Sequence, residues 1–212
     1  LAARMQDRFV DVTFAHGDVR AEERYDHVVN ALWDGRLVID ETAGIRPERP
    51  WLWRVKHFMR IRAAAHAAPI PSTTIILGPF GDVVNYATGD VYLSWYPESC
   101  RERSSGLEAP ETGLPAAPEL RARLRAAMPP ALARIVPSIA GLPAVALDEA
   151  EIDGGIIFAW GAGDVDDPAS GLHERALIGV RSHGRYHSID TGKYTTAPLF
   201  AREAADRVRA MG

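Results

Sequence analysis

The segment TTIILGPFGDVVNYATGDVYLSWY, from Thr73 to Tyr96, decides the fold class of this chain. It contains three short runs, 73–77, 83–86 and 91–96, that are rich in β-branched and aromatic side chains. The breaks between the runs contain glycine and aspartate, which tight turns favour. Strands joined by turns this short are antiparallel. The sequence therefore predicts a β-meander that forms a sheet of its own.

Toward the N-terminus, the pattern predicts two further strands. Residues 9–14 alternate apolar and polar side chains with the period of a strand. The run Val28–Leu32 is apolar apart from Asn30, which predicts a short strand buried on both faces. Residues 34–44 are rich in turn formers and then weakly helical, and residues 51–62 alternate aromatic, basic and apolar side chains.

Toward the C-terminus, helical periodicity begins at Leu120 and is expected to break at Pro129-Pro130, with a second short helix over 132–139. Strands are predicted at 152–160 and 176–181, and an amphipathic helix at 197–211. The mixture of a buried strand near the start, an antiparallel meander, a helical insert and a final strand and helix predicts the α+β class.

Composition narrows the function classes. The 212 residues carry a net charge of -4 without a long run of like charge, which argues against a nucleic-acid-binding surface. The single cysteine, Cys100, excludes an internal disulfide and a multi-cysteine zinc site, and a cytoplasmic location is expected. No apolar run approaches the ~20 residues that span a bilayer, so no membrane partner is expected.

Two segments resemble parts of the FAD-dependent oxidoreductases of the D-amino-acid-oxidase superfamily. Residues 25–33 (YDHVVNALW) are similar to the strand of these flavoproteins that ends in VVNAxG or ATG and runs beside the FAD, although Leu32-Trp33-Asp34-Gly35 replaces the early glycine of that pattern. Residues 185–198 (RYHSIDTGKYTTAP) are similar to the C-terminal turn that contacts the flavin and leads into the last helix. The resemblance implies FAD as the cofactor.

The same resemblance implies which residues lie beside the FAD: Asn30, Gly192, Lys193, Thr195 and Thr196. In the superfamily, the amides of this turn face the pyrimidine edge of the flavin ring. A ligand is physically reasonable there, because a glycine lets backbone amides approach it and a helix N-terminus presents N–H groups at the positive end of its dipole. We expect Thr195 or Thr196 to cap the helix or to bond a cofactor hydroxyl, with Pro198 in the first turn.

The most specific feature of the superfamily, a G-x-G-x-x-G after a strand, is absent from these 212 residues. We therefore expect an N-terminal FAD-binding segment or a second chain as a partner, and the first residue, Leu1, is consistent with a fragment or a processed product. The implied parts are return strands of the FAD-binding domain (1–48), a substrate domain with the antiparallel sheet and helices (49–165), and the FAD-contacting turn with the C-terminal helix (166–212).

Three residues are candidates for catalysis or substrate contact. In the superfamily a sheet roofs the flavin and its aromatic or basic side chains hold the substrate, which implies this role for Tyr86 and Tyr92. The alternative is that these aromatics simply pack in their strands. Arg181, which precedes the Gly192 turn, is a candidate for stabilising a substrate acid or the flavin anion.

Two other groups of charged residues have plainer interpretations. The basic residues Arg54, Lys56, His57 and Arg60 either present a cation to a substrate carboxylate or, as we prefer, form a solvated basic face. Three aspartates in the loop after residue 160 lack the spacing of a calcium-binding loop and are interpreted as a polar turn, so no metal site is predicted.

The expected function is therefore the oxidation of a small amine, amino acid or hydroxy acid by hydride transfer to FAD. The alternative is a non-catalytic domain, derived from such an enzyme, that binds a ligand or a partner. Such a domain exposes the apolar surface that the missing half would cover, so it would tend to oligomerise.

Overall fold

The structure is a computed structural model and describes residues 25–62, 70–76, 79–100, 102–163, 167, 169–171 and 178–212. The chain divides into two compact units, which we call the terminal unit (Leu1–Arg46 with Ile178–Gly212) and the central unit (Pro47–Leu177). The three-part division expected from the sequence stays a prediction. The strand predicted at 9–14, and the aspartates Asp164 and Asp166, lie outside the described residues.

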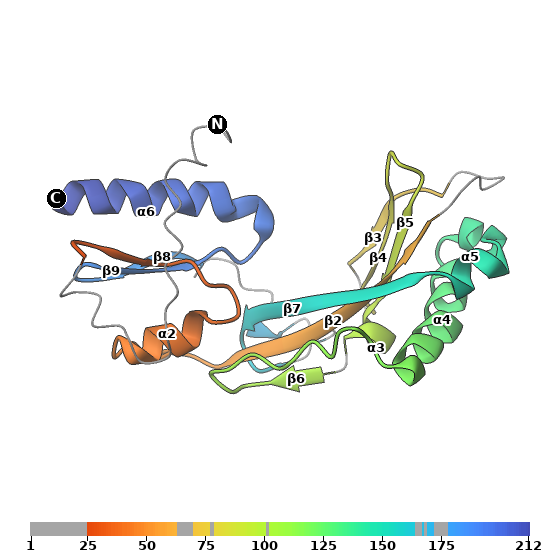
Figure 1. Cartoon of the computed structure of the whole chain (residues 1–212), viewed down its shortest axis with the longest axis horizontal. Coiled ribbons are helices and arrows are strands. Elements are labelled where there is room, and N and C mark those ends of the chain that lie inside the picture. Colours follow the sequence, from red (N-terminus) through yellow and green to blue (C-terminus); the bar gives the residue numbers. More distant parts are fainter. Residues whose placement is uncertain are drawn as a thin grey trace. The chain divides into compact units, whose positions relative to one another are not determined.

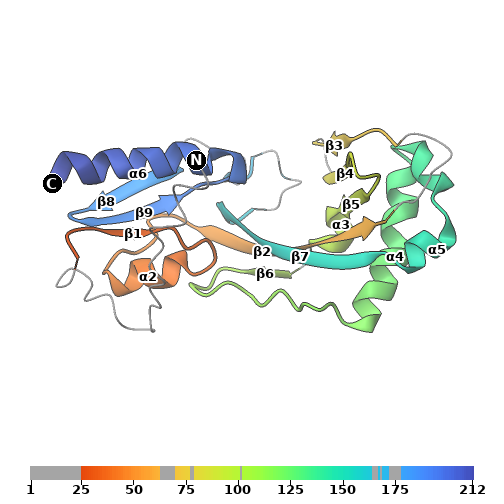
Figure 2. The same ribbon diagram turned by 45° about the horizontal axis from the view of Figure 1, so that its top comes forward.

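A three-stranded sheet lies between two helices in the terminal unit (Figures 1 and 2). The strand order is β1 (Val28–Asn30), β9 (Tyr186–Asp190), β8 (Gly179–His183). Strands β8 and β9 form an antiparallel hairpin, whereas β1 is parallel to β9. The helices α6 (Ala197–Met211) and α2 (Arg36–Thr42) lie on opposite faces of this sheet, and α6 begins and ends where its amphipathic pattern predicts.

Strand β1 is shorter and more exposed than its sequence indicates. It ends at Asn30, and the N–H of Leu32 bonds Asn30 Oδ1 at 3.1 Å where the chain turns away. Val29 is 44% exposed and Asn30 only 4%, so the polar residue of the run is the buried one. The prediction of a strand buried on both faces is wrong, because β1 is the outer strand of this sheet among the described residues and α6 packs on β8 and β9.

Strand β2 (Trp51–Ile61) is the spine of a six-stranded sheet in the central unit. It pairs antiparallel with β7 (Glu151–Trp160) from Trp51 to Arg60 along one edge. Its other edge pairs with β5 (Val91–Trp95) and β6 (Glu102–Ser104) at opposite ends. The strands β4 (Gly81–Asn85) and β3 (Thr73–Ile75) extend the sheet beyond β5, which confirms the predicted meander.

The core of the central unit lies on one face of this sheet. Side chains alternate along β2, and Met59 and Ile61 have no exposed surface on that face. They pack with Leu124, Met128 and Leu132, the buried stripe of helix α4 (Pro118–Ala133). The remaining helical elements of this unit are α3 (Tyr96–Ser99), the 3-10 helix η3 (Pro137–Gly141) and α5 (Ala144–Asp148).

Helix α4 runs through Pro129 and Pro130, so the predicted break and the second helix over 132–139 are wrong. Each proline removes a backbone donor, and proline in a helix interior costs about 3 kcal/mol. Burial of each large apolar side chain contributes about 1.5–3 kcal/mol. The stripe buries two such residues before the prolines, Leu124 and Met128, and one after them, Leu132. Continuing the helix keeps Leu132 in the core, which offsets part of the cost of the prolines.

The architecture is α+β, as the sequence predicts: an antiparallel sheet whose core face packs against helix α4, and a small mixed sheet between two helices. Across the part of the chain that is described, every helix is too short or too polar to span a lipid bilayer.

Candidate functional site: the carboxyl ends of two parallel strands

The parallel strands β1 and β9 end within two residues of each other in register. Their register places Asn30, the last residue of β1, beside Ser188 of β9. In open sheets with parallel strands, ligands bind outside the carboxyl ends of the strands. Strand β9 continues through Thr191 and Gly192 into the turn that begins α6, so the turn that resembles a flavin contact follows directly from this edge.

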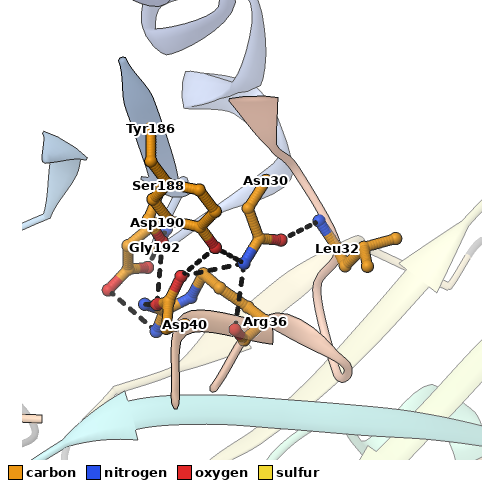
Figure 3. Close-up of polar contacts among 8 residues, drawn as sticks. All are labelled: Asn30, Leu32, Arg36, Asp40, Tyr186, Ser188, Asp190 and Gly192. Carbon is orange, nitrogen blue, oxygen red and sulfur yellow. Dashed lines mark hydrogen bonds and ion pairs between the residues drawn. The ribbon is translucent and has the colours of Figure 1, made fainter. Parts of the chain in front are cut away.

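Asn30 is buried and uses its whole side-chain amide (Figure 3). Its Nδ2 lies 2.9 Å from Asp40 Oδ1, 2.8 Å from the Tyr186 hydroxyl and 3.0 Å from the carbonyl oxygen of Arg36. Because Asp40 and Arg36 belong to α2 and Tyr186 to β9, one amide joins β1 to both. This explains why an asparagine interrupts an apolar strand.

Asp40 is the common acceptor of the network. Its Oδ1 accepts the Tyr186 hydroxyl at 2.7 Å, and its Oδ2 accepts the Ser188 hydroxyl at 2.8 Å. Burial, together with the Asp40 carboxylate, raises the pKa of Tyr186 well above its usual value. The phenol is therefore a neutral donor, and the carboxylate is satisfied by groups from β1 and β9.

Arg36 balances the charge of this buried cluster. Its NH1 lies 3.4 Å from Asp40 Oδ2, and its NH2 lies 3.8 Å from Asp190 Oδ2. Burial lowers the pKa of Arg36, while Asp190 and Asp40 act to raise it. Arg181 lies opposite Ser188 in the β8–β9 pairing, on the same face, and its charge acts to lower that pKa further.

Asp190 connects the network to the turn. Its Oδ1 accepts the Gly192 N–H at 3.0 Å, while its Oδ2 faces Arg36. Gly192 has a φ of +61°, and a Cβ there would lie 2.9 Å from Cδ1 of Ile178. Both the backbone conformation and the close packing therefore require glycine at this position.

The turn after Gly192 satisfies some of its own backbone donors. The N–H of Lys193 bonds Thr191 O at 2.6 Å, and the N–H of Thr196 bonds Lys193 O at 3.1 Å. Tyr194 and Thr195 open a 3-10 turn, η5 (Tyr194–Thr196), and the first N–H groups of such a turn have no partner within it. Both residues are exposed, so their N–H groups are the backbone donors that remain for a ligand.

Thr196 occupies the N-cap position of α6, but it does not cap the helix with its side chain. Its hydroxyl donates to the carbonyl oxygens of Thr191 and Lys193 instead. The expected threonine cap is therefore wrong for Thr196, because the turn uses this hydroxyl to close itself. Proline stands in the first turn of α6, as expected for Pro198. The exposed Lys193 and Thr195 stay predictions as cofactor contacts.

Tyr92 lies in a second polar cluster, on the face of the central sheet that points away from the core. Lys56 Nζ lies 3.0 Å from Asp82 Oδ2, and 4.7 Å and 5.7 Å from the ring centroids of Tyr96 and Tyr92. The hydroxyl of Ser94 lies 3.2 Å from the same Asp82 oxygen. Burial alone lowers the pKa of Lys56, but Tyr96, Tyr92 and Asp82 raise it above its ordinary value. The lysine is therefore a fixed ammonium group and not a nucleophile.

The basic residues of β2 do not form the solvated face that we preferred. Arg54 is 1% exposed and His57 is 5% exposed, and each bonds a backbone carbonyl. Lys56 pairs with Asp82, and Arg60 pairs with Asp90. The interpretation fails for two reasons. His57 points to the core side, because alternate residues of a strand point to opposite faces. Arg54 shares the face of Lys56 and Arg60, but it is buried there and bonds the carbonyl oxygen of Gly163.

The structure thus brings some of the candidate residues together in the terminal unit, whereas others belong to the central unit. Asn30 and Gly192 belong to one network, and Arg181 lies on the same sheet. Tyr92 lies in the central unit, as does Tyr86, which is 47% exposed in the turn after β4. Whether Tyr86, Tyr92 and Arg181 act on a substrate stays a prediction.

Sequence reasoning missed most of the network. Arg36, Asp40, Tyr186, Ser188 and Asp190 were not candidates, although two weak signals were present. Tyr186, Ser188 and Asp190 recur with the period of a strand, and Arg36 and Asp40 have the spacing of neighbours on one helix face.

Comparison with known proteins gives a distant structural likeness. No protein-family model matches the sequence. No curated protein matches it. The structure is similar to the FAD-dependent oxidoreductase PA4991 from Pseudomonas aeruginosa, with a TM-score of 0.45 and 16% sequence identity, over 87% of this chain and 45% of that one. This chain therefore spans less than half the length of that protein, and it resembles part of an FAD-dependent oxidoreductase.

Proposed function

We propose that this chain is the substrate-domain and ring-contact portion of an FAD-dependent oxidoreductase that acts on a small amine, amino acid or hydroxy acid. The observation that carries the proposal is the buried network at the carboxyl ends of β1 and β9, which fixes the turn leading into α6. When bound, the flavin would supply the acceptor for a hydride from the substrate.

The turn fits the ring end of a flavin. Tyr194 and Thr195 are exposed residues at the start of η5, where the first N–H groups have no partner within the turn, and the positive end of the α6 dipole follows them. Such donors suit the carbonyl oxygens of the pyrimidine edge and the negative charge of a reduced ring. The side chain of Lys193 adds an exposed cation to the same turn. The buried network keeps these groups in place by bonding Gly192 through Asp190.

Within the central unit, the substrate would contact the open face of the six-stranded sheet. Tyr92 stands on that face with its hydroxyl-bearing ring beside the fixed Lys56 ammonium, and Tyr86 lies on the adjoining turn. In the terminal unit, Arg181 is a cation near the Arg36–Asp190 pair, and we propose that it stabilises a substrate acid or the flavin anion. A hydride transfer needs positioning more than a strong base, which matches a site made of aromatic and cationic groups.

The pyrophosphate of the FAD would be held by a partner. The 212 residues contain no G-x-G-x-x-G motif. On the described part of the molecule, the outer edge of β1 and the exposed side chains of Val29 and Leu32 offer a place for a further strand of an FAD-binding segment or a second chain.

The first test is the absorption spectrum of the protein purified from its source with every chain that accompanies it. Flavin bands, together with a co-purifying segment that contains G-x-G-x-x-G, would support the proposal. If this preparation contains no flavin and takes up none from added FAD, the flavoenzyme proposal is refuted and a non-catalytic binding domain remains.

A pair of variants tests the turn itself. Thr195→Pro removes one of the two exposed N–H donors, and Thr195→Ala keeps it. Loss of a hydrogen bond to a charged or strongly polar acceptor costs about 1.5 kcal/mol, so the proline variant should bind flavin about tenfold more weakly than the alanine variant. Equal affinities, with α6 equally protected from hydrogen exchange in both variants, would remove the turn from the site.

A further inference from the structure

A chain of hydrogen bonds through two histidines lies outside the site described above. On the α6 side of the small sheet, Arg207 donates to Ser182 Oγ at 3.0 Å, and Ser182 Oγ lies 2.8 Å from His187 Nδ1. His187 Nε2 lies 3.1 Å from His27 Nδ1. The two imidazole rings are stacked, with centroids 5.3 Å apart and an interplanar angle of 19°, and His187 has no exposed surface.

The hydrogen bonds from Arg207 to His27 can all be donated in the same direction, so that each group donates a proton to the next. A guanidinium can only donate, so Ser182 accepts from Arg207 and directs its own proton to His187 Nδ1. Neutral His187 then carries its proton on Nε2 and donates it to His27 Nδ1. In this arrangement, the contact between the two rings contains a single proton.

The contact tolerates one additional proton but not two. A single imidazolium can still donate across the pair, because the facing nitrogen of its neighbour remains an acceptor. With both rings protonated, His27 Nδ1 and His187 Nε2 would each direct a proton at the other across 3.1 Å. Two cations would then lie beside a third, Arg207. Double protonation is therefore incompatible with the observed geometry.

The surrounding charges oppose protonation. Burial, His27 and Arg207 all lower the pKa of His187. The charged groups on the neighbouring elements offer little compensation, because Glu203 is bound to Arg207 and Asp26 has a fully solvated side chain near Arg185. His183, at the end of β8, is exposed.

The histidine pair holds the start of a very short strand. His27 immediately precedes β1, which has three residues and pairs with β9 among the described strands. The far end of β1 is tied by Asn30. We propose that the His27–His187 contact is a pH-sensitive clasp that holds β1 against β9 at neutral pH and opens as the pH falls through about 6.

The clasp should respond steeply to pH. Once open, both rings are solvated and each accepts a proton, whereas the closed pair accepts none or one. Opening therefore takes up one to two protons, and the opening constant rises by about ten- to a hundredfold for each pH unit below the ordinary histidine pKa. This inference does not depend on flavin binding.

Amide hydrogen exchange on the full chain tests the clasp. We compare protection of the β1 and β9 amides at about pH 7.5 and about pH 5.5, corrected for the intrinsic pH dependence of exchange, with β2 and β7 amides as the internal reference. Protection of β1 should fall at least about tenfold relative to the reference. In His27→Phe, which keeps a stacked ring but removes the shared proton, most of this pH dependence should disappear. The exposed His183→Gln control should retain it.

Nitrogen-15 NMR of the histidine rings provides the second measurement, and it requires no variant. His27 and His187 should become protonated together, in step with the loss of β1 protection. Independent protonation of both rings while β1 stays protected would overturn the proposal. Unchanged pH dependence in His27→Phe would overturn it as well. If His27→Phe unfolds the terminal unit, the wild-type titration alone decides.

Discussion

Replacement of Asp40 by asparagine tests whether the buried network holds the terminal unit together. Asp40 is 4% exposed and accepts the hydroxyl groups of Tyr186 and Ser188. Asparagine has nearly the same shape, but its Nδ2 would direct a donor at one of these hydroxyl donors. It would also leave Arg36 with Asp190 as its remaining carboxylate among these contacts, at 3.8 Å.

The magnitude follows from burial. Removing one partner of a buried ion pair costs about 3–5 kcal/mol, and an unsatisfied buried donor costs about 1–3 kcal/mol. These effects overlap at a single atom, so we expect the free energy of unfolding of the terminal unit to fall by about 3–5 kcal/mol. That decrease is on the order of a hundred- to several-thousandfold in the unfolding equilibrium. Little screening by solvent applies, because Asp40 and Arg36 are each 4% exposed.

The assay must separate the two units, because a single unfolding curve for the chain would average them. We would follow hydrogen exchange by mass spectrometry through a urea series, with peptides from α2 and β9 reporting on the terminal unit and peptides from β2 and β7 on the central unit. Asp90→Asn is the matched control, since the same change there affects Arg60, whose side chain is 46% exposed. An exposed pair of this kind contributes up to about 1 kcal/mol.

The reasoning is refuted if Asp40→Asn lowers the free energy of unfolding by no more than Asp90→Asn does. It would mean that the network tolerates an amide in place of its carboxylate, and that the Gly192 turn is held by other contacts. An equal loss of protection in both units would contradict the assignment of the effect to the terminal unit.

Three other substitutions probe separate features. Gly192→Ala should lower the free energy of unfolding, measured in urea, by about 2–4 kcal/mol, because it adds a clash with Ile178 to the strain of a φ of +61°. The control Gly44→Ala, at a φ of +75° with open space around it, should lower it by only about 1 kcal/mol. Equal decreases would show that packing against Ile178 contributes nothing. Pro130→Ala should raise the stability of the central unit by about 1 kcal/mol in thermal unfolding, because it restores a backbone donor to α4. A decrease in stability would show that proline is favourable at this position. Because the folded pKa of Tyr186 lies above its unfolded value of about 10, the stability from its neutral form is present below that pH and is lost as the pH rises above it. Tyr186→Phe should therefore leave the phenolate absorbance titration of the folded protein unchanged near pH 10, and the loss of one titrating tyrosine there would contradict the buried hydrogen bond.

Several elements were evident from local patterns alone. The meander from Thr73 to Trp95, the strand β7 and the helix α6 all lie where the sequence predicts them. In each case one face is buried and the other is not, so the period of the apolar residues reports the backbone geometry directly. The α+β class followed from the same patterns. The alternation along β2 was visible in the sequence, but its place as the spine of the sheet was not.

Other features depend on partners far away in the chain. Asn30 is buried because Tyr186, 156 residues later, and Asp40 bond its amide. The strand β9 exists where the sequence indicated a turn, since β1 and β8 supply its neighbours on either side. Helix α4 continues through two prolines because a buried stripe lies on both sides of them.

The candidate site shows the same division. The sequence by itself determined the turn at Gly192 and the helix that follows it, because a glycine, a proline and an amphipathic period are local signals. Only the tertiary structure decided that Arg36, Asp40, Ser188 and Asp190 hold this turn beside Asn30. A polar side chain becomes part of a buried network only where distant segments bring enough donors and acceptors to replace its water, and no local pattern records that balance.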